Sequence, residues 1–366
     1  MEINVGKNIL IKRGKRPKNL SKYESNFKIS NSIPYPKQSD ICNDSIYLYK
    51  CKTYFKTNLG FNFQPALRGD LLISSSCDIG NVVILDFDIA FIDDKFFNLK
   101  ISKNILKNYV KYWLIKNKKD ISKLGYGTTI KVLYIKPFQK YLNNQFIPSI
   151  NTQQKIINII EPFELLKQNF YNKKNKLINL INYLYKYNSQ NSDKENYLLS
   201  MTNLFNKKYE NQNMYIETSN INENMSITNK IKEISKNKKP SRANLSPKNN
   251  SLIFAKLRGS QKIFPIYDKK YTNYVYSTGF YNISANDLDW YLLGFLNSKD
   301  FIIQKNNNSS GTLMQGITIK DLNKIKIKIP KNKYKLNSIV KTISKINLVI
   351  ETIDEIISNL IELSVI

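Results

Sequence analysis

One segment near the C-terminus has the apolar pattern of a helix that packs along one side. Residues 336–360 read LNSIVKTISKINLVIETIDEIISNL. Two interleaved rows of apolar residues repeat every seven positions there: Leu336, Ile343, Ile350 and Ile357 in one row, Ile339, Ile346, Ile353 and Leu360 in the other. Such a heptad spacing is typical of a coiled coil. We therefore predict a long helical region over residues 331–366.

A similar run occupies the middle of the chain, over residues 151–190. Its first row is Ile156, Phe163, Phe170, Leu177 and Leu184, and its second row is Ile159, Leu166, Leu180 and Tyr187, with Lys173 as an interruption. Pro162 lacks the backbone donor that a helix interior requires, so we expect a short helix, a break near Pro162, and then a long helix. We expect the two runs to pair antiparallel through these rows.

The rest of the chain is repeated. Four pairs of segments occur in the same order and at a nearly constant separation: 35–41 with 215–221, 69–73 with 250–254, 127–135 with 311–319, and 146–148 with 328–330. A repeat of this length indicates a duplicated domain rather than a solenoid. Each copy combines short apolar runs typical of strands with helical patterns at 104–116 and 287–296. We predict an α+β fold, in which mixed domains at 1–150 and 191–330 are joined by the two antiparallel helical regions.

The net charge is strongly positive. The 366 residues include 57 Lys and Arg against 28 Asp and Glu, a formal net charge of +29. Part of this excess reflects a composition that is rich in Lys, Asn, Ile and Tyr together. A charge of this size still produces a positive potential that favours a polyanion, either nucleic acid or an acidic membrane surface.

Several classes of catalytic site are excluded by composition. The chain has no histidine, which removes every His base, His metal ligand and His proton shuttle. It has neither a phosphate-binding nor a dinucleotide-binding glycine motif. Asp86 or Asp88 with 93–95 resembles a nuclease carboxylate arrangement, but a solvated turn after a strand is the simpler interpretation. We expect a protein that is not an enzyme and that has no cofactor and no metal.

The cellular compartment is indicated by the cysteines and the N-terminus. Cys42, Cys51 and Cys77 are odd in number and lack the spacing of a zinc site, which favours reduced thiols. The N-terminus has no signal-peptide pattern, and no apolar run approaches the length that spans a bilayer. We expect a cytoplasmic protein without a membrane partner.

Basic and polar side chains gather in both halves of the chain. Lys and Arg bind phosphates, Arg also binds the guanine edge, and smaller polar side chains can read other base edges. The candidate DNA-binding residues are Lys12, Arg13, Lys15, Arg16, Lys37 and Ser39 in the first half, and Lys238, Lys239, Ser241, Arg242, Lys256, Arg258 and Lys262 in the second. Each of these taken alone also fits an ordinary solvated surface residue.

The chain resembles the specificity subunit of type I restriction–modification systems over nearly its whole length. In the first half, the resemblance rests on the strand entry at 69–74 and on Pro148 followed by 152–156. In the second half, it rests on 240–243, 276–280, 311–317 and the closing heptad helix. No single one of these segments is diagnostic, and the resemblance depends on their order and their duplication.

The resemblance implies a function and a set of partners. Such subunits carry two target recognition domains, each of which reads one half of a bipartite, asymmetric site in double-stranded DNA. Their helices set the spacing and dock two methyltransferase (modification) subunits, which bind S-adenosylmethionine, and restriction subunits complete the ATP-driven nuclease. A type IIB-like or methylation-only complex would use the same architecture, and a two-headed DNA-binding scaffold for another protein is a third interpretation.

Overall fold

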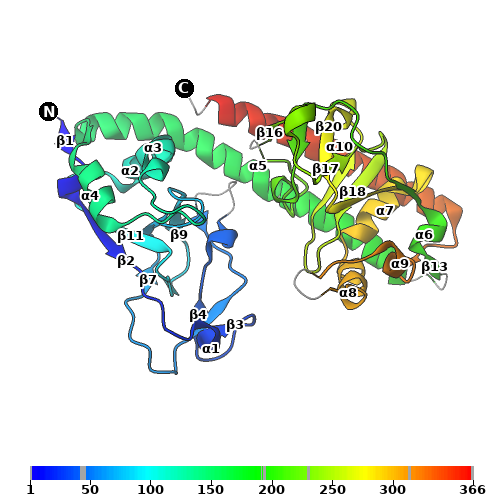
Figure 1. Ribbon diagram of the computed structural model, residues 1–366, viewed down its shortest axis with the longest axis horizontal. Helices are drawn as coiled ribbons and strands as arrows, with labels where there is room; N and C mark the ends of the chain where they lie inside the picture. Colours follow the sequence, from blue (N-terminus) through cyan, green and yellow to red (C-terminus); the bar gives the residue numbers. More distant parts are fainter. Residues whose placement is uncertain are drawn as a thin grey trace. The chain divides into compact units, whose positions relative to one another are not determined.

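The computed structural model describes residues 2–41, 47–190, 192, 195–228, 231–311 and 315–363. The chain forms two compact units (Figure 1). Unit 1 comprises Met1–Asn169 with Leu360–Ile366, and unit 2 comprises Phe170–Asn359. Both units combine sheets with helices, so the predicted α+β class is confirmed.

The centre of unit 1 is a five-stranded sheet. Its strands, in spatial order, are β2 (Ile9–Arg13), β11 (Phe96–Ile101), β8 (Leu71–Ser74), β9 (Val82–Leu85) and β5 (Tyr47–Leu48). Neighbouring strands are antiparallel except β5 and β9. Both faces of β8 are covered: Leu71 and Ile73 belong to a core with the helices, and Leu72 belongs to a core on the other side. Burial on both faces explains why this strand reads as a continuous apolar run.

Shorter elements surround the sheet of unit 1. The helical elements are η1 (Gly6–Asn8), α1 (Leu20–Tyr23), η2 (Gln38–Asp40), α2 (Lys107–Lys116), α3 (Lys118–Lys123) and α4 (Ile135–Asn143). The remaining strands form the sheet β3 (Glu24–Ser25), β6 (Tyr54–Lys56) and β4 (Ser32–Pro34), and the pairs β7 (Ala66–Leu67) with β10 (Ile89–Ala90) and β1 (Ile3–Asn4) with β12 (Phe146–Ile147). Fully buried Tyr35, Phe55 and Phe91 form an aromatic core beside the three-stranded sheet.

Unit 2 contains two four-stranded sheets and a strand pair. The first sheet is β14 (Asn203–Phe205), β21 (Phe280–Ser284), β18 (Ser251–Ala255) and β19 (Ile263–Ile266). The second is β16 (Lys232–Glu233), β15 (Met214–Ile216), β20 (Tyr274–Ser277) and β17 (Ala243–Leu245), and β13 (Glu195–Tyr197) pairs with β22 (Lys326–Lys328). The helical elements are α6 (Leu198–Met201), η3 (Thr218–Asn220), η4 (Lys236–Lys238), η5 (Lys269–Asn273), η6 (Asn286–Leu288), α7 (Asp289–Leu296), α8 (Lys299–Asn307) and α9 (Ile319–Leu322).

The duplication extends to individual hydrogen bonds, and this confirms the predicted repeat. In unit 1, Ser75 N donates to Lys95 O at 2.8 Å and Leu133 N donates to Ser75 O at 2.7 Å. In unit 2, Lys256 N donates to Gly279 O at 2.9 Å and Ile317 N donates to Lys256 O at 3.0 Å. The isolated bridges also correspond: Ser76–Val132 and Tyr126–Val132 in unit 1, Leu257–Gly316 and Ser310–Gly316 in unit 2. We call this shared backbone arrangement the hydrogen-bond frame.

Two long helices follow the two repeated domains. They are α5 (Ile150–Gln190) and α10 (Lys333–Leu363). The predicted break near Pro162 is wrong, because α5 continues through this residue. Pro162 lies on an exposed side of the helix, where water can hydrate the backbone carbonyl that loses its donor.

Within unit 2 the two helices pack antiparallel, as the sequence predicts. Lys174 forms an ion pair with Asp354. Further along α5, Ile181 and Ile343 both lie 3.6 Å from the position that a Cβ atom on Gly294 would take. Later positions on α5 therefore meet earlier positions on α10, as in an antiparallel pair. Gly294 lets α7 approach this pair closely, since its Cβ would lie only 3.0 Å from Tyr185 Cβ.

The buried row of α10 coincides with the apolar rows read from its sequence. Leu336, Ile339, Ile343, Ile346, Ile350, Ile353, Ile357 and Leu360 are all at most 8% exposed. Those that pack in the main core of unit 2 are Leu336, Ile339, Ile343, Ile346 and Ile350, together with residues of the domain. Helix α10 therefore packs against both the domain of unit 2 and helix α5.

The row assigned to α5 needs a correction of one residue. Ile156, Phe170, Leu177 and Leu184 are half-buried, and Phe163 is 40% exposed. Four buried residues directly follow Ile156, Phe170, Leu177 and Leu184. The buried positions of α5 are Gln153, Ile157, Tyr171, Lys174, Ile178, Ile181, Tyr185, Asn188 and Ser189. Apolar residues stand next to each other at 177–178, 180–181 and 184–185, so two adjacent rows satisfy the heptad spacing equally well.

Candidate nucleic-acid interface

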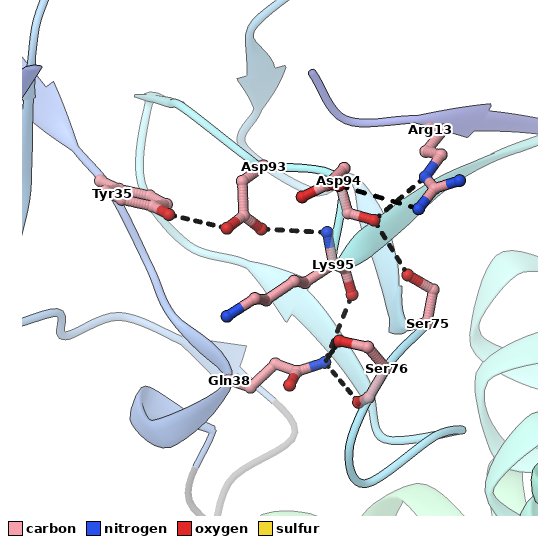
Figure 2. A network of polar contacts seen from close by, with 8 residues as sticks. All are labelled: Arg13, Tyr35, Gln38, Ser75, Ser76, Asp93, Asp94 and Lys95. Carbon is pink, nitrogen blue, oxygen red and sulfur yellow. Dashed lines mark hydrogen bonds and ion pairs between the residues drawn. The ribbon is translucent and has the colours of Figure 1, made fainter. Parts of the chain in front are cut away.

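The carboxylates that resemble a nuclease motif are used in internal contacts. Tyr35 Oη donates to Asp93 Oδ2 at 2.7 Å, and Lys95 N donates to Asp93 Oδ1 at 3.1 Å (Figure 2). Burial of the Tyr35 hydroxyl and the neighbouring negative charge of Asp93 raise the pKa of Tyr35 far above its usual range. Asp86 and Asp88 both pair with Arg68. No group of three or more Asp, Glu or Cys side chains suited to a metal exists among the residues described, and these contacts favour the interpretation as a turn.

In unit 1 three segments meet beside this turn. Gln38 on η2 donates through Nε2 to Ser76 O at 2.7 Å and to Lys95 O at 3.3 Å. Figure 2 shows Gln38 and Lys95 at this meeting point, and the Lys95 side chain is exposed. The residues Ser75, Ser76 and Lys95 belong to the hydrogen-bond frame. Its surface in unit 1 therefore presents an amide and an ammonium group.

The basic loop of unit 1 starts at the end of β2. Lys12 and Arg13 are partly held, because Lys12 Nζ donates to Gln64 Oε1 at 3.4 Å and Arg13 Nε donates to Asp94 O at 3.1 Å. Lys15 and Arg16 are exposed. Gly14 is required between Arg13 and Lys15, since a Cβ there would lie 2.0 Å from Asp93 O. The loop is thereby anchored to the turn that precedes β11.

Two further candidates of unit 1 lie at η2: Lys37 directly precedes it, and Ser39 is part of it. Lys37 forms an ion pair with Glu24 at 3.3 Å, and Ser39 is exposed. The backbone N of Lys37 donates to Asp40 Oδ2 at 2.8 Å, which closes the turn. Lys37 and Ser39 therefore flank Gln38 in this short closed turn.

In unit 2 the candidates Lys256, Arg258 and Lys262 occupy the β18–β19 hairpin. The ammonium group of Lys256 lies 4.2 Å from the centre of the Tyr281 ring, and Lys262 Nζ donates to Thr218 O at 2.6 Å. Burial lowers the pKa of Lys256. Arg258 is exposed, its guanidinium donates to Gln315 Oε1, and its backbone N donates to Gln315 O at 2.9 Å. Only Arg258 among the three presents its charge mainly to solvent.

A buried lysine that was not predicted from the sequence binds the backbone of this hairpin. Lys305 on α8 is 1% exposed and donates to the backbone oxygens of Ala255 and Ser260. Its neighbour Asn306 accepts a hydrogen bond from Gly259 N at 2.8 Å. Burial lowers the pKa of Lys305 to about 8. Nothing in the local sequence separates Lys305 from the many exposed lysines of the chain.

A cleft of about 260 Å³ lies beside η3 in unit 2. Its lining residues are Tyr215, Glu217, Thr218, Pro240, Ser241, Arg242 and Ser277. Two of the predicted DNA-binding residues, Ser241 and Arg242, are thus brought together here, whereas Glu217 was not predicted. Of the other two candidates, Lys238 is exposed, and Lys239 donates to Ala243 O at 3.1 Å and lies 5.1 Å from the Tyr209 ring centre.

Other expectations concern the membrane and the thiols. Within the described part of the chain, no helix is both long enough and apolar enough to cross a bilayer. Cys51 and Cys77 are free thiols, and burial raises the pKa of Cys51. Cys42 lies outside the described residues, as do Thr312, Leu313 and Met314 of the repeated 311–317 segment.

Comparisons with known proteins gave matches among solved structures alone. No family model and no curated protein matches this chain. A type I restriction–modification S subunit from M. genitalium is 14% identical with a TM-score of 0.43, covering 100% of this chain and 93% of that one. A structure concerned with complex assembly and conformational transition of the type I R–M system is 12% identical, with a TM-score of 0.35 and coverage of 100% and 95%. The HsdS subunit from Thermoanaerobacter tengcongensis is 11% identical, with a TM-score of 0.35 and coverage of 100% and 94%.

Proposed function

We propose that this chain is the DNA-binding specificity subunit of a type I restriction–modification complex. Residues 1–150 and 191–330 form two target recognition domains, and each reads one half of a bipartite, asymmetric site in double-stranded DNA. Residues 151–190 and 331–366 form the helical regions that set the spacer and dock two methyltransferase subunits. Catalysis belongs to these partners and to the restriction subunits.

The observation that carries this proposal is the hydrogen-bond frame with different side chains on its two copies. The backbone bonds of Ser75 and Lys95 in unit 1 correspond to those of Lys256 and Gly279 in unit 2. A duplicated frame supplies two surfaces of the same shape, and unlike side chains on these surfaces supply different chemistry. Two related surfaces that read two different sequences are what a bipartite asymmetric site requires.

The charge of the chain supports DNA as the ligand. Exposed basic side chains occur in both units, namely Lys15, Arg16 and Lys95 in unit 1 and Lys238, Arg242 and Arg258 in unit 2. Lysine and arginine contacts to phosphate fix the protein on the duplex, and contacts to base edges give specificity. The net charge of +29 provides the electrostatic attraction.

The exposed side of α5 supports a protein partner. Leu180, Tyr183 and Tyr187 belong to unit 2 and are 42%, 60% and 52% exposed, and the rings of Tyr183 and Tyr187 stack. Large apolar side chains grouped on one helix are typical of a docking surface. We assign this side of the helix to a methyltransferase subunit.

The experiment is a comparison of host methylomes with and without this gene. We expect one bipartite motif, two short half-sites around a spacer of unspecified sequence, to lose methylation on deletion and to regain it on complementation. Restriction of unmethylated foreign DNA would separate the full complex from a methylation-only one. An unchanged methylome, or loss of a contiguous motif, would contradict the proposal.

A further inference from the structure

The unit 2 cleft is lined by a free cation and a fixed anion that come from two different segments. Arg242 precedes β17, is exposed, and its guanidinium has no hydrogen-bond or ion-pair partner among the residues that the structure describes. Glu217 precedes η3, and its carboxylate accepts from Lys232 Nζ at 2.6 Å and from Ser219 Oγ at 3.1 Å. The bond from Lys232 lowers the pKa of Glu217, so this carboxylate is ionised at neutral pH.

The backbone around Arg242 is fixed although its side chain is free. Arg242 O accepts from Thr278 N at 2.9 Å and from Asn244 N at 3.0 Å, and Pro240 O accepts from Ala243 N at 2.9 Å. Thr278 directly precedes Gly279 of the hydrogen-bond frame. The frame therefore fixes the backbone position from which the Arg242 side chain extends. Binding then has to order little more than this side chain, which keeps the entropic cost of binding small.

Glu217 is held with similar firmness. Its backbone N donates to Asn220 Oδ1 at 2.8 Å, and its O accepts from Asn220 N at 3.0 Å. A carboxylate offers about four lone-pair sites, and the contacts from Lys232 and Ser219 occupy only some of them. Glu217 thus retains acceptor capacity toward a ligand.

We propose that the unit 2 cleft reads one G·C base pair through the major groove, with Arg242 donating to guanine O6 and N7 and Glu217 accepting from cytosine N4. The major-groove edge of this pair presents two acceptors on guanine next to a donor on cytosine. A phosphate would match Arg242 but has no hydrogen-bond donor to offer to Glu217. This assignment rests on the proposed function and deepens it, because it makes Arg242 a specificity-determining residue rather than a phosphate contact.

The first half of the chain gives an internal comparison. Lys37 stands where Glu217 stands in the repeat, and each precedes a short 3-10 helix with the same closing bonds, Lys37 N to Asp40 Oδ2 and Glu217 N to Asn220 Oδ1. The charge at this position is reversed between the units. A lysine cannot accept from cytosine N4, so unit 1 does not read a G·C pair in this way.

The test uses the full chain assembled with its methyltransferase partner and duplexes that carry its methylated motif. Each base pair of both half-sites is substituted in turn, and the loss of affinity is measured for wild type, Arg242→Ala, Glu217→Met and the control Lys238→Ala. For wild type, substitution at the G·C pair should cost about 5- to 150-fold in Kd. For Arg242→Ala that penalty should fall several-fold at this pair alone, and Glu217→Met, which removes the carboxylate acceptor, should relax the same pair.

The control separates base reading from phosphate binding. Lys238→Ala should weaken binding to all duplexes alike and leave the pattern of penalties unchanged. Uniform weakening by Arg242→Ala, an unchanged pattern for both cleft variants, or relaxation of two different pairs would overturn the proposal. Glu217→Met nearly keeps the size of the side chain, removes the carboxylate oxygens, and decides the matter alone if Arg242→Ala does not assemble. A wild-type complex that is indifferent to every substitution would instead overturn the proposed function itself.

Discussion

The ammonium group of Lys174 lies 2.7 Å and 2.6 Å from the two carboxylate oxygens of Asp354, and the lysine side chain is completely buried. The same group donates to Ser226 Oγ at 2.6 Å. Lys174 occupies the buried row of α5, where an apolar residue would be expected. It connects both long helices to a loop of the domain in unit 2, and so favours one alignment of α5 against α10.

Removing Asp354 should therefore destabilise the chain far more than removing its neighbour. Asp354→Ala leaves a buried ammonium ion with its main counter-charge gone, at a cost of about 3 kcal/mol. Glu355→Ala, at an exposed position, should change stability by at most about 0.5 kcal/mol. Thermal unfolding of the purified chain measures both. The double variant Lys174→Met with Asp354→Leu should recover most of the loss, and equal effects of Asp354→Ala and Glu355→Ala would refute the role of this pair.

Neighbouring residues of α5 should respond differently to a new charge. Ile181 is fully buried, and Leu180 is 42% exposed. Ile181→Asp places a carboxylate in the core of unit 2 and should cost several kcal/mol, of the order of 3 to 5 kcal/mol, whereas Leu180→Asp should cost less than about 1 kcal/mol. Unfolding by urea provides the measurement. Leu180→Asp should instead reduce copurification with the methyltransferase. If Leu180→Asp destabilised the chain more than Ile181→Asp, the row predicted from the sequence, which contains Leu180, would be the buried one.

Asp289 should make stability depend on pH between about 4 and 6. The residue is 4% exposed, and its burial raises the pKa of the carboxyl group to about 6, although Ser284 Oγ donates to it at 3.0 Å. Since the folded-state pKa is raised, the stabilising contribution is complete below pH 4 and is lost as the pH rises through 6, a change of about 3 kcal/mol. Asp289→Asn keeps the acceptor oxygen and removes the titration. The melting temperatures of wild type and variant, plotted against pH, should converge or cross between pH 4 and 6. Parallel plots would contradict the assignment.

Binding to DNA should weaken with salt through the basic loop of unit 1. Lys15 and Arg16 are exposed, and each phosphate contact that is lost should flatten the log–log salt dependence by about 0.9. The variant Lys15→Ala with Arg16→Ala should therefore lower the slope of the assembled complex by up to about 2. Lys341→Ala with Lys345→Ala removes the same charge from exposed positions of α10 and serves as the control. Equal slopes for the two variants would place the phosphate contacts of unit 1 elsewhere.

The architecture could be predicted from the sequence because it depends on the heptad spacing of apolar residues and on the repeated segments. The rows of α10 contain apolar residues at every position, so a single stripe satisfies the heptad spacing. In α5 the buried row contains Gln153 and Lys174, which are stabilised by tertiary partners that local sequence does not reveal: Gln153 by Leu106 N and Pro148 O, Lys174 by Asp354. The apolar residues beside this row then suggested a stripe displaced by one position.

The candidate site was predictable only in part. Arg242 and Ser241 stood out as members of a basic cluster, and they do line the unit 2 cleft. Glu217 was missed because a search for positive charge passes over a carboxylate. The repeat itself offered the signal, since it aligns Glu217 with Lys37. Lys305 could not be recognised, because its burial depends on the β18–β19 hairpin that folds over it.

The central claim is that the two halves of the chain read two separate half-sites. It is tested most directly by replacing residues 1–150 with the first recognition domain of another specificity subunit and sequencing the host methylome. The account predicts a new motif in which one half-site is changed and the other is retained, with methylation still dependent on the gene. A methylome in which the exchange alters both half-sites, or leaves both unchanged, would contradict it.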